Sequence, residues 1–132
     1  MKWTAEHWDG FTERLFCFTL QGVDGIAELD AKWFRPDRHR SKCVSRTIVE
    51  IDDGPIQAIL PNLRGMDALY DCHWDDVRTD ILTVEIDGEV IERKVRGGGG
   101  LVKKHPELRP FMKLFEWFES QVLSHIKNEM SA

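Results

Sequence analysis

The clearest pattern in the chain is an alternation of apolar and polar residues over positions 81–95. Leu82, Val84 and Ile86 are separated by polar residues, and this period of two is typical of a strand with one buried face. Asp87-Gly88 follows, a pair that favours the two-residue turn of a β-hairpin. The sequence therefore predicts a hairpin over these residues.

The first part of the chain predicts shorter elements. The segment before residue 21 fits either one helical face or a strand, so we expect a short helical turn from Ala5 to Phe11 and then a strand from Arg14 to Gln21. A second strand, Ile26–Phe34, returns after a turn rich in glycine and aspartate. The β-branched residues of Cys43–Ile51 indicate a third strand.

Two helices are expected, one in the middle of the chain and one at its end. Asp53 precedes Gly54-Pro55, and aspartate at an N-cap with proline in the first turn is typical of a helix start. A hairpin turning on Asp53-Gly54 is the alternative for this segment. At the end of the chain, apolar residues recur at every third or fourth position, which predicts a long helix from Glu107 to Asn128.

A run of glycines, Gly97–Gly100, separates the hairpin from the last helix. Lys103 and Lys104 follow, but the spacing of a nucleotide-binding phosphate loop is absent. We interpret the run as a flexible linker that lets the last helix fold back over the sheet.

These elements predict a single α+β domain over residues 1–132, in the order hairpin, strand, helix, hairpin, helix. Its antiparallel sheet has about five strands, which come from two hairpins plus one strand. A central helix and a long C-terminal helix complete the domain, and the C-terminal helix is packed on one face of the sheet.

Composition narrows the class of protein. The 132 residues are 42% hydrophobic and 31% charged, which is enough apolar material for one core and excludes an intrinsically disordered chain. No apolar run approaches the ~20 residues that cross a bilayer, and no secretory signal is visible, so we expect a cytoplasmic protein without a membrane partner. The three cysteines lack metal-ligand spacing, which favours free thiols without a structural metal, and we expect no cofactor.

Charge is unevenly distributed along the chain. The formal net charge of −5 argues against a protein that coats nucleic acid over its whole surface. Cations dominate residues 32–46, whereas five aspartates face only Arg78 between residues 67 and 80. The acidic and basic segments therefore mark two different candidate surfaces.

The favoured function is a non-enzymatic protein-binding module, in the form of a small acidic inhibitor or immunity-type protein. The five tryptophans exceed what so small a core can bury completely, and exposed tryptophan is typical of protein interfaces. An acidic segment would speed association with a basic target. The predicted protein-binding residues are Asp71, Trp74, Asp75, Asp76 and Trp117, in a monomer or a homodimer.

Two alternatives belong to other classes. Nucleic acid or another anion could be held by the basic loop 32–46, since guanidinium groups grip phosphates; the candidates are Arg35, Arg38, Arg40 and Lys42. A small Cys/His- or Asp/His-dependent hydrolase or transferase could use Cys72 and His73, which are adjacent in the chain. No motif accompanies them, so no catalytic residue is assigned.

Two segments carry a resemblance. Residues 18–25 form a hairpin with a Gly-x-Asp-Gly turn, and residues 78–88 place Thr-Asp before a second hairpin that turns on Asp-Gly. In this arrangement, most of residues 14–123 resembles an uncharacterised bacterial α+β domain-of-unknown-function family. The resemblance implies a fold and no activity.

Overall fold

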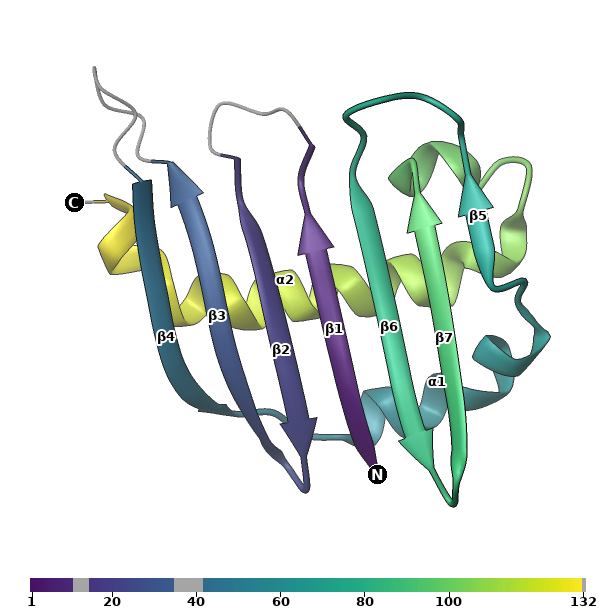
Figure 1. The fold of residues 1–132 in the computed structure, drawn as a ribbon, viewed down its shortest axis with the longest axis horizontal. Coiled ribbons are helices and arrows are strands. Elements are labelled where there is room, and N and C mark those ends of the chain that lie inside the picture. Colours follow the sequence, from purple (N-terminus) through teal and green to yellow (C-terminus); the bar gives the residue numbers. More distant parts are fainter. Residues whose placement is uncertain (11–14, 35–41, 132) are drawn as a thin grey trace.

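The fold is built on one sheet of seven strands with two helices on one face (Figure 1). The computed structural model describes residues 1–10, 15–34 and 42–131. The strands lie in the order β4-β3-β2-β1-β6-β7-β5. Their bounds are Lys2–Trp8 for β1, Cys17–Val23 for β2, Ile26–Phe34 for β3, Lys42–Glu50 for β4, Leu69–Asp71 for β5, Thr79–Ile86 for β6 and Glu89–Arg96 for β7.

The sheet is mixed. Each neighbouring pair of strands is antiparallel except β5 and β7, which run parallel. The α+β class and the long C-terminal helix are confirmed, but the prediction of about five strands was too low. The two strands that the sequence prediction missed are β1 and β5. β5 has only three residues, too few to show a period.

β1 replaces the helical turn predicted over Ala5–Phe11. This strand lies in the middle of the sheet, between β2 and β6, and turns Trp3, Ala5 and His7 toward the helices. The alternation was difficult to recognise because its inward positions include a small residue and a histidine. The apparent helical face joined residues of β1 and β2, which the structure places on separate strands.

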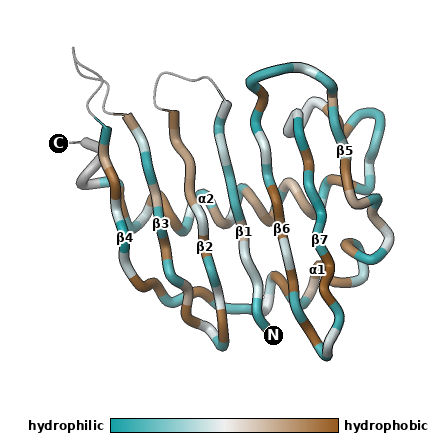
Figure 2. The backbone as a smooth tube through the Cα atoms, viewed as in Figure 1, coloured by the Kyte–Doolittle hydropathy of each residue, from teal (hydrophilic) through white to brown (hydrophobic). Residues whose placement is uncertain are grey.

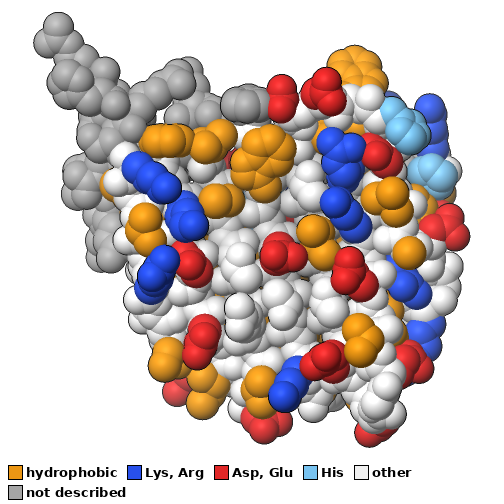
Figure 3. Space-filling model, viewed as in Figure 1, with side chains coloured by type: hydrophobic (Ala, Val, Ile, Leu, Met, Phe, Trp, Pro, Cys, Tyr) orange, Lys and Arg blue, Asp and Glu red, His pale blue; other side chains and the backbone are white. Residues whose placement is uncertain are grey.

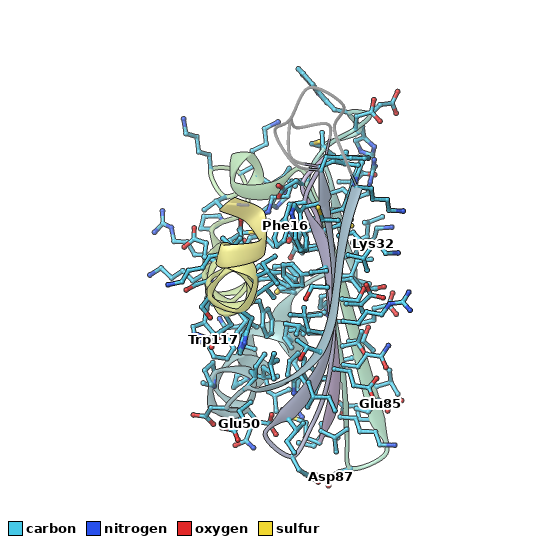
Figure 4. The ribbon with its side chains drawn as sticks, turned by 90° about the vertical axis from the view of Figure 1, so that its left-hand side faces the viewer. Phe16, Lys32, Glu50, Glu85, Asp87 and Trp117 are labelled. Atoms are coloured by element: carbon cyan, nitrogen blue, oxygen red, sulfur yellow. The ribbon has the colours of Figure 1, made fainter. Side chains whose placement is uncertain are left out.

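The helices α1, Gly54–Gly65, and α2, Arg109–Ser131, cover the same face of the sheet (Figure 4). α1 begins where aspartate and proline predicted it, so the alternative hairpin on Asp53-Gly54 was wrong. The indole nitrogen of Trp3 donates a hydrogen bond of 3.1 Å to Asp53 Oδ1, which ties the start of α1 to β1. α2 crosses behind the strands and reaches β4 at its C-terminal end (Figure 1).

The core lies between α2 and the sheet. Phe111, Phe115 and Phe118 are completely buried on α2, and Trp3 of β1 stacks on Phe118 with ring centroids 5.3 Å apart. Burying each such side chain contributes about 2–3 kcal/mol. These aromatic residues therefore hold the last helix on the central strand.

The start of the glycine run is packed, in contrast to the flexible linker that we predicted, whereas Gly99 and Gly100 are exposed. Gly98–Leu101 form a short 3-10 helix, and Leu101 is buried. Gly97 has φ +128°, and a Cβ there would lie 2.9 Å from the sulfur of Cys72. Glycine is needed at this position because neither the backbone angle nor the space accommodates a side chain.

No helix among the described residues lies on the other face of the sheet. Hydrophilic and hydrophobic positions alternate along its strands (Figure 2), and this face carries charged and apolar side chains side by side (Figure 3). None of the described helices is both long enough and apolar enough to span a membrane.

Candidate functional site

The candidate site lies in the connection from β5 to β6, and we call residues 72–77 of this connection the Trp74 loop. Arg96 at the end of β7 holds this loop. Its Nη1 donates to both carboxylate oxygens of Asp71, at 2.9 and 3.0 Å, and its Nη2 donates to the carbonyl of Trp74 at 3.4 Å. The N–H of Cys72 donates to the carbonyl of Arg96 at 3.0 Å. One arginine thereby connects the base of the loop to its tip.

Asp71 is the anchor of this arrangement. The N–H of His73 donates to its Oδ1 at 2.8 Å. This hydrogen bond, together with the guanidinium of Arg96, lowers the pKa of Asp71 below its usual value. Asp71 is therefore a carboxylate throughout the neutral pH range and keeps its hydrogen bonds to Arg96.

The backbone of the Trp74 loop is strained. His73 and Asp76 have φ angles of +62° and +59°, a region that side-chain-bearing residues seldom occupy. Gly10 packs against the loop so closely that a Cβ there would lie 2.7 Å from the carbonyl oxygen of Asp76. Such conformations persist where the surrounding structure imposes them, and they concentrate at functional sites.

The loop displays an aromatic ring among carboxylates. Trp74 is 74% exposed, the largest value among the large hydrophobic residues that the structure describes. Asp75 and Asp76, which follow it, are exposed as well. Figure 3 shows acidic and hydrophobic groups together at this end of the molecule.

A partly buried ionic network lies next to the loop. We call it the His7 network, and it consists of His7, Asp9, Arg78 and Asp80. Asp80 is completely buried and accepts from Arg78 Nε at 2.9 Å and from His7 Nδ1 at 2.7 Å. His7 Nε2 donates to Asp9 Oδ1 at 2.5 Å. His7 and Asp80 are direct neighbours across β1 and β6, so the sheet register brings them together.

His7 is an imidazolium ion in this network. Burial by itself lowers its pKa, but the hydrogen bonds to Asp80 and Asp9 outweigh that effect and raise it to about 9. The ring therefore carries its charge at neutral pH, and both ring nitrogens are donors.

The only group of metal-ligand side chains found among the described residues overlaps this network. It consists of His7, Asp9 and Glu119, which each offer one atom within 4.8 Å of the others. A metal would need the lone pair of His7 Nε2, where the imidazolium carries a proton. The arrangement fits an ion pair that stabilises the fold better than a metal centre. Sequence reasoning missed this group because Glu119 on α2 lies far along the chain from His7 and Asp9.

The structure brings together four of the five predicted protein-binding residues. Asp71, Trp74, Asp75 and Asp76 all belong to the Trp74 loop or its anchor. Trp117 does not join them, because it lies on α2 at the helix face of the molecule (Figure 4). There it is half-buried and lines a shallow hollow of about 340 Å³ between α1 and α2.

The residues of the alternative functions are less concentrated. Lys42 begins β4 at the opposite edge of the sheet, and Arg35, Arg38 and Arg40 lie outside the described residues. Cys72 packs against Gly97, while the side chain of His73 is 86% exposed and its Nδ1 is 3.9 Å from Asp71 Oδ2. Burial raises the pKa of the Cys17 thiol, which makes it less reactive.

In comparisons with known proteins, the chain matches no family model and no curated protein sequence. The resemblance to an uncharacterised bacterial family therefore stays a prediction.

Proposed function

We propose that the protein is a non-enzymatic protein-binding module that recognises its partner through the Trp74 loop. The observation that carries the proposal is a tryptophan 74% exposed on a strained loop that Arg96 holds in place. Burying this ring in a partner would remove a large apolar surface from water.

The hydrogen bonds of Arg96, which we call the arginine clamp, support binding because they fix the loop before a partner arrives. A loop that is already ordered loses little conformational entropy on binding, so more of the contact energy appears as affinity. Tryptophan is also the residue type most enriched among the side chains that dominate binding energy at interfaces.

The charges around Trp74 define the partner's chemistry. Asp75 and Asp76 flank the ring on its C-terminal side, and the whole chain carries a net charge of −5. The complementary surface is an apolar pocket ringed by lysine and arginine, to which opposite charge steers the loop. A small acidic inhibitor or immunity-type protein that occupies a basic site is the specific form of this proposal.

The test compares capture of proteins from native lysate by the immobilised wild type and by Trp74→Ala. We expect the variant to lose a basic partner that the wild type retains at low salt. Measured on the purified pair, the affinity should fall about 30-fold or more, since a central interface tryptophan contributes about 2 kcal/mol or more.

The matched control is Val90→Ala. Val90 is also apolar and 61% exposed, but it lies beside the turn between β6 and β7, at the other end of those strands. If Trp74→Ala captures the same proteins in the same amounts as this control, the Trp74 loop is not the binding surface. A partner whose association rate is unaffected by salt would contradict the electrostatic part of the proposal.

A further inference from the structure

The two edges of the sheet are protected very differently. At one edge stands β5, which is only three residues long, and beside it Arg93 of β7 donates to the carbonyl of Leu63 in α1 at 2.7 Å. At the other edge stands β4, with nine residues in unbroken register against β3 and without proline. In Figure 4 this edge faces the viewer, and no described segment crosses it. A long, uncovered edge strand is a template for pairing with another chain.

The register shows which backbone groups of β4 are available. Ile51, just beyond the strand, donates its N–H to Gly25 on the β3 side at 3.0 Å. Backbone groups alternate between the two sides of a strand, so the odd-numbered residues of β4 face β3 and the even-numbered ones face outward. Val44, Arg46 and Ile48 therefore each turn an N–H and a C=O toward the free edge.

The sequence of β4 is complementary to itself in one antiparallel register. With Arg46 opposite Arg46 of a second copy, Lys42 lies opposite Glu50 at both ends of the ladder. In the same register, Val44 lies opposite Ile48, and these two side chains are 49% and 69% exposed in the single chain. Opposite charges and paired β-branched residues are the cross-strand neighbours that stabilise sheets.

The single unfavourable pair in this register has a compensating contact. Arg46 would face its own copy, but its Nε lies 3.4 Å from Asp30 Oδ2 on β3. The carboxylate draws the guanidinium toward the neighbouring strand and offsets part of the repulsion. α2 also reaches β4 behind the sheet (Figure 1), so a strand added here has a helix near its inner face.

We propose that β4 pairs antiparallel with β4 of a second copy of this chain, which joins the two sheets into one continuous sheet. The axis of the pair is a two-fold through Arg46, so the contact closes on itself and gives a dimer. The pairing involves no residue of the Trp74 loop and is independent of the proposed function.

The test uses charge reversal at the two ends of the ladder, read by sedimentation or light scattering. Over a protein concentration of about 10 μM to 1 mM, the average mass of the wild type should rise from 15.3 kDa toward twice that value. The range extends to high concentration because one strand pair buries less area than a standard interface. Lys42→Glu and Glu50→Lys should each weaken the dimer at least tenfold. An equal mixture of the two variants should restore it, because each copy then supplies the charge that its partner lacks.

Lys2→Glu and Glu85→Lys are the matched controls. These two residues are also paired across strands, on β1 and β6, and their reversal changes the net charge by the same amounts away from β4. Both controls should dimerise like the wild type, and circular dichroism should show every variant folded.

Four results would overturn the proposal. The wild type could stay at 15.3 kDa throughout the range. The single variants could dimerise as well as the controls, or their mixture could stay monomeric. Loss of the dimer in Trp74→Ala but not in the β4 variants would assign self-association to the Trp74 loop and equally overturn it.

Discussion

At the residue scale, the most consequential feature is a charged histidine inside the sheet. An isolated buried charge is costly, and His7 is tolerated because Asp80 and Asp9 accept from both of its ring nitrogens. Arg78 completes the balance by donating to the other oxygen of Asp80. The network also fixes Arg78, which directly follows the Trp74 loop, so it stabilises the site as well as the core.

The His7 network predicts that stability falls as pH rises from neutral. The pKa of His7 is about 9 in the folded protein and about 6.5 in the unfolded chain. The folded state binds its proton more tightly, so its contribution is complete below pH 6.5 and is lost as pH rises through 9. Denaturant unfolding between pH 6 and 9.5 should show a loss of about 3 kcal/mol.

The control for this pH dependence is a second histidine. His125→Gln removes an exposed ring on α2 and should leave the dependence unchanged. His7→Gln should flatten it and lower the stability near pH 6. A wild-type stability that stays constant from pH 6.5 to 9 would show that His7 is not held as an imidazolium.

At the element scale, α2 and β1 depend on each other. Phe118 is completely buried and contacts three aromatic rings, those of Trp3, Phe115 and Trp117. Its stacking on Trp3 joins the last helix to the first strand, the two ends of the chain.

Phe118→Ala should therefore lower the free energy of unfolding by about 3–5 kcal/mol, through lost burial and the cavity left behind. Urea unfolding followed by circular dichroism measures this loss. Glu116→Ala, an exposed change on the same helix, should alter stability by less than about 0.5 kcal/mol. Equal effects of the two substitutions would mean that α2 does not pack as described.

The Trp74 loop is an element whose order depends on a single side chain. Arg96→Ala removes the contacts to Asp71 and to the carbonyl of Trp74. We expect the amides of residues 72–77 to exchange hydrogen at least tenfold faster, since the left-handed residues then lose their support. Hydrogen exchange read by mass spectrometry tests this.

The control for the clamp is Arg64→Ala. Arg64 pairs with Glu89 at 3.3 Å on the surface, where an ion pair contributes little. It should leave exchange in the Trp74 loop unchanged. Unaltered exchange in Arg96→Ala would show that Arg96 does not order the Trp74 loop before binding. The exposure of Trp74 would then be the remaining support for the binding proposal.

At the scale of the whole molecule, the sheet separates two surfaces. β4 and β5 stand at opposite edges, and the Trp74 loop leaves from the β5 edge. In the proposed dimer, the two β4 edges meet at the centre and the two loops lie at the far ends. Such a dimer presents two binding loops, which strengthens attachment to a partner that has two sites.

Local sequence patterns were sufficient to predict the features that depend on near neighbours. The hairpin of β6 and β7, the strand β3 and both helices follow from periodicity, turn residues and caps that lie within a few positions of one another. Asp71, Trp74, Asp75 and Asp76 could be grouped for the same reason, because they are adjacent in the chain.

The features that join distant residues became visible in the three-dimensional fold alone. Whether residues 2–8 form a strand depended on β2 and β6 on either side, and the partner of His7 is Asp80, far along the chain. The distance of Trp117 from the Trp74 loop likewise depends on how α2 lies on the sheet. The hydrophobic pattern of one segment shows only the period of that segment. Pairing across a sheet depends on contacts with residues that are distant in the sequence.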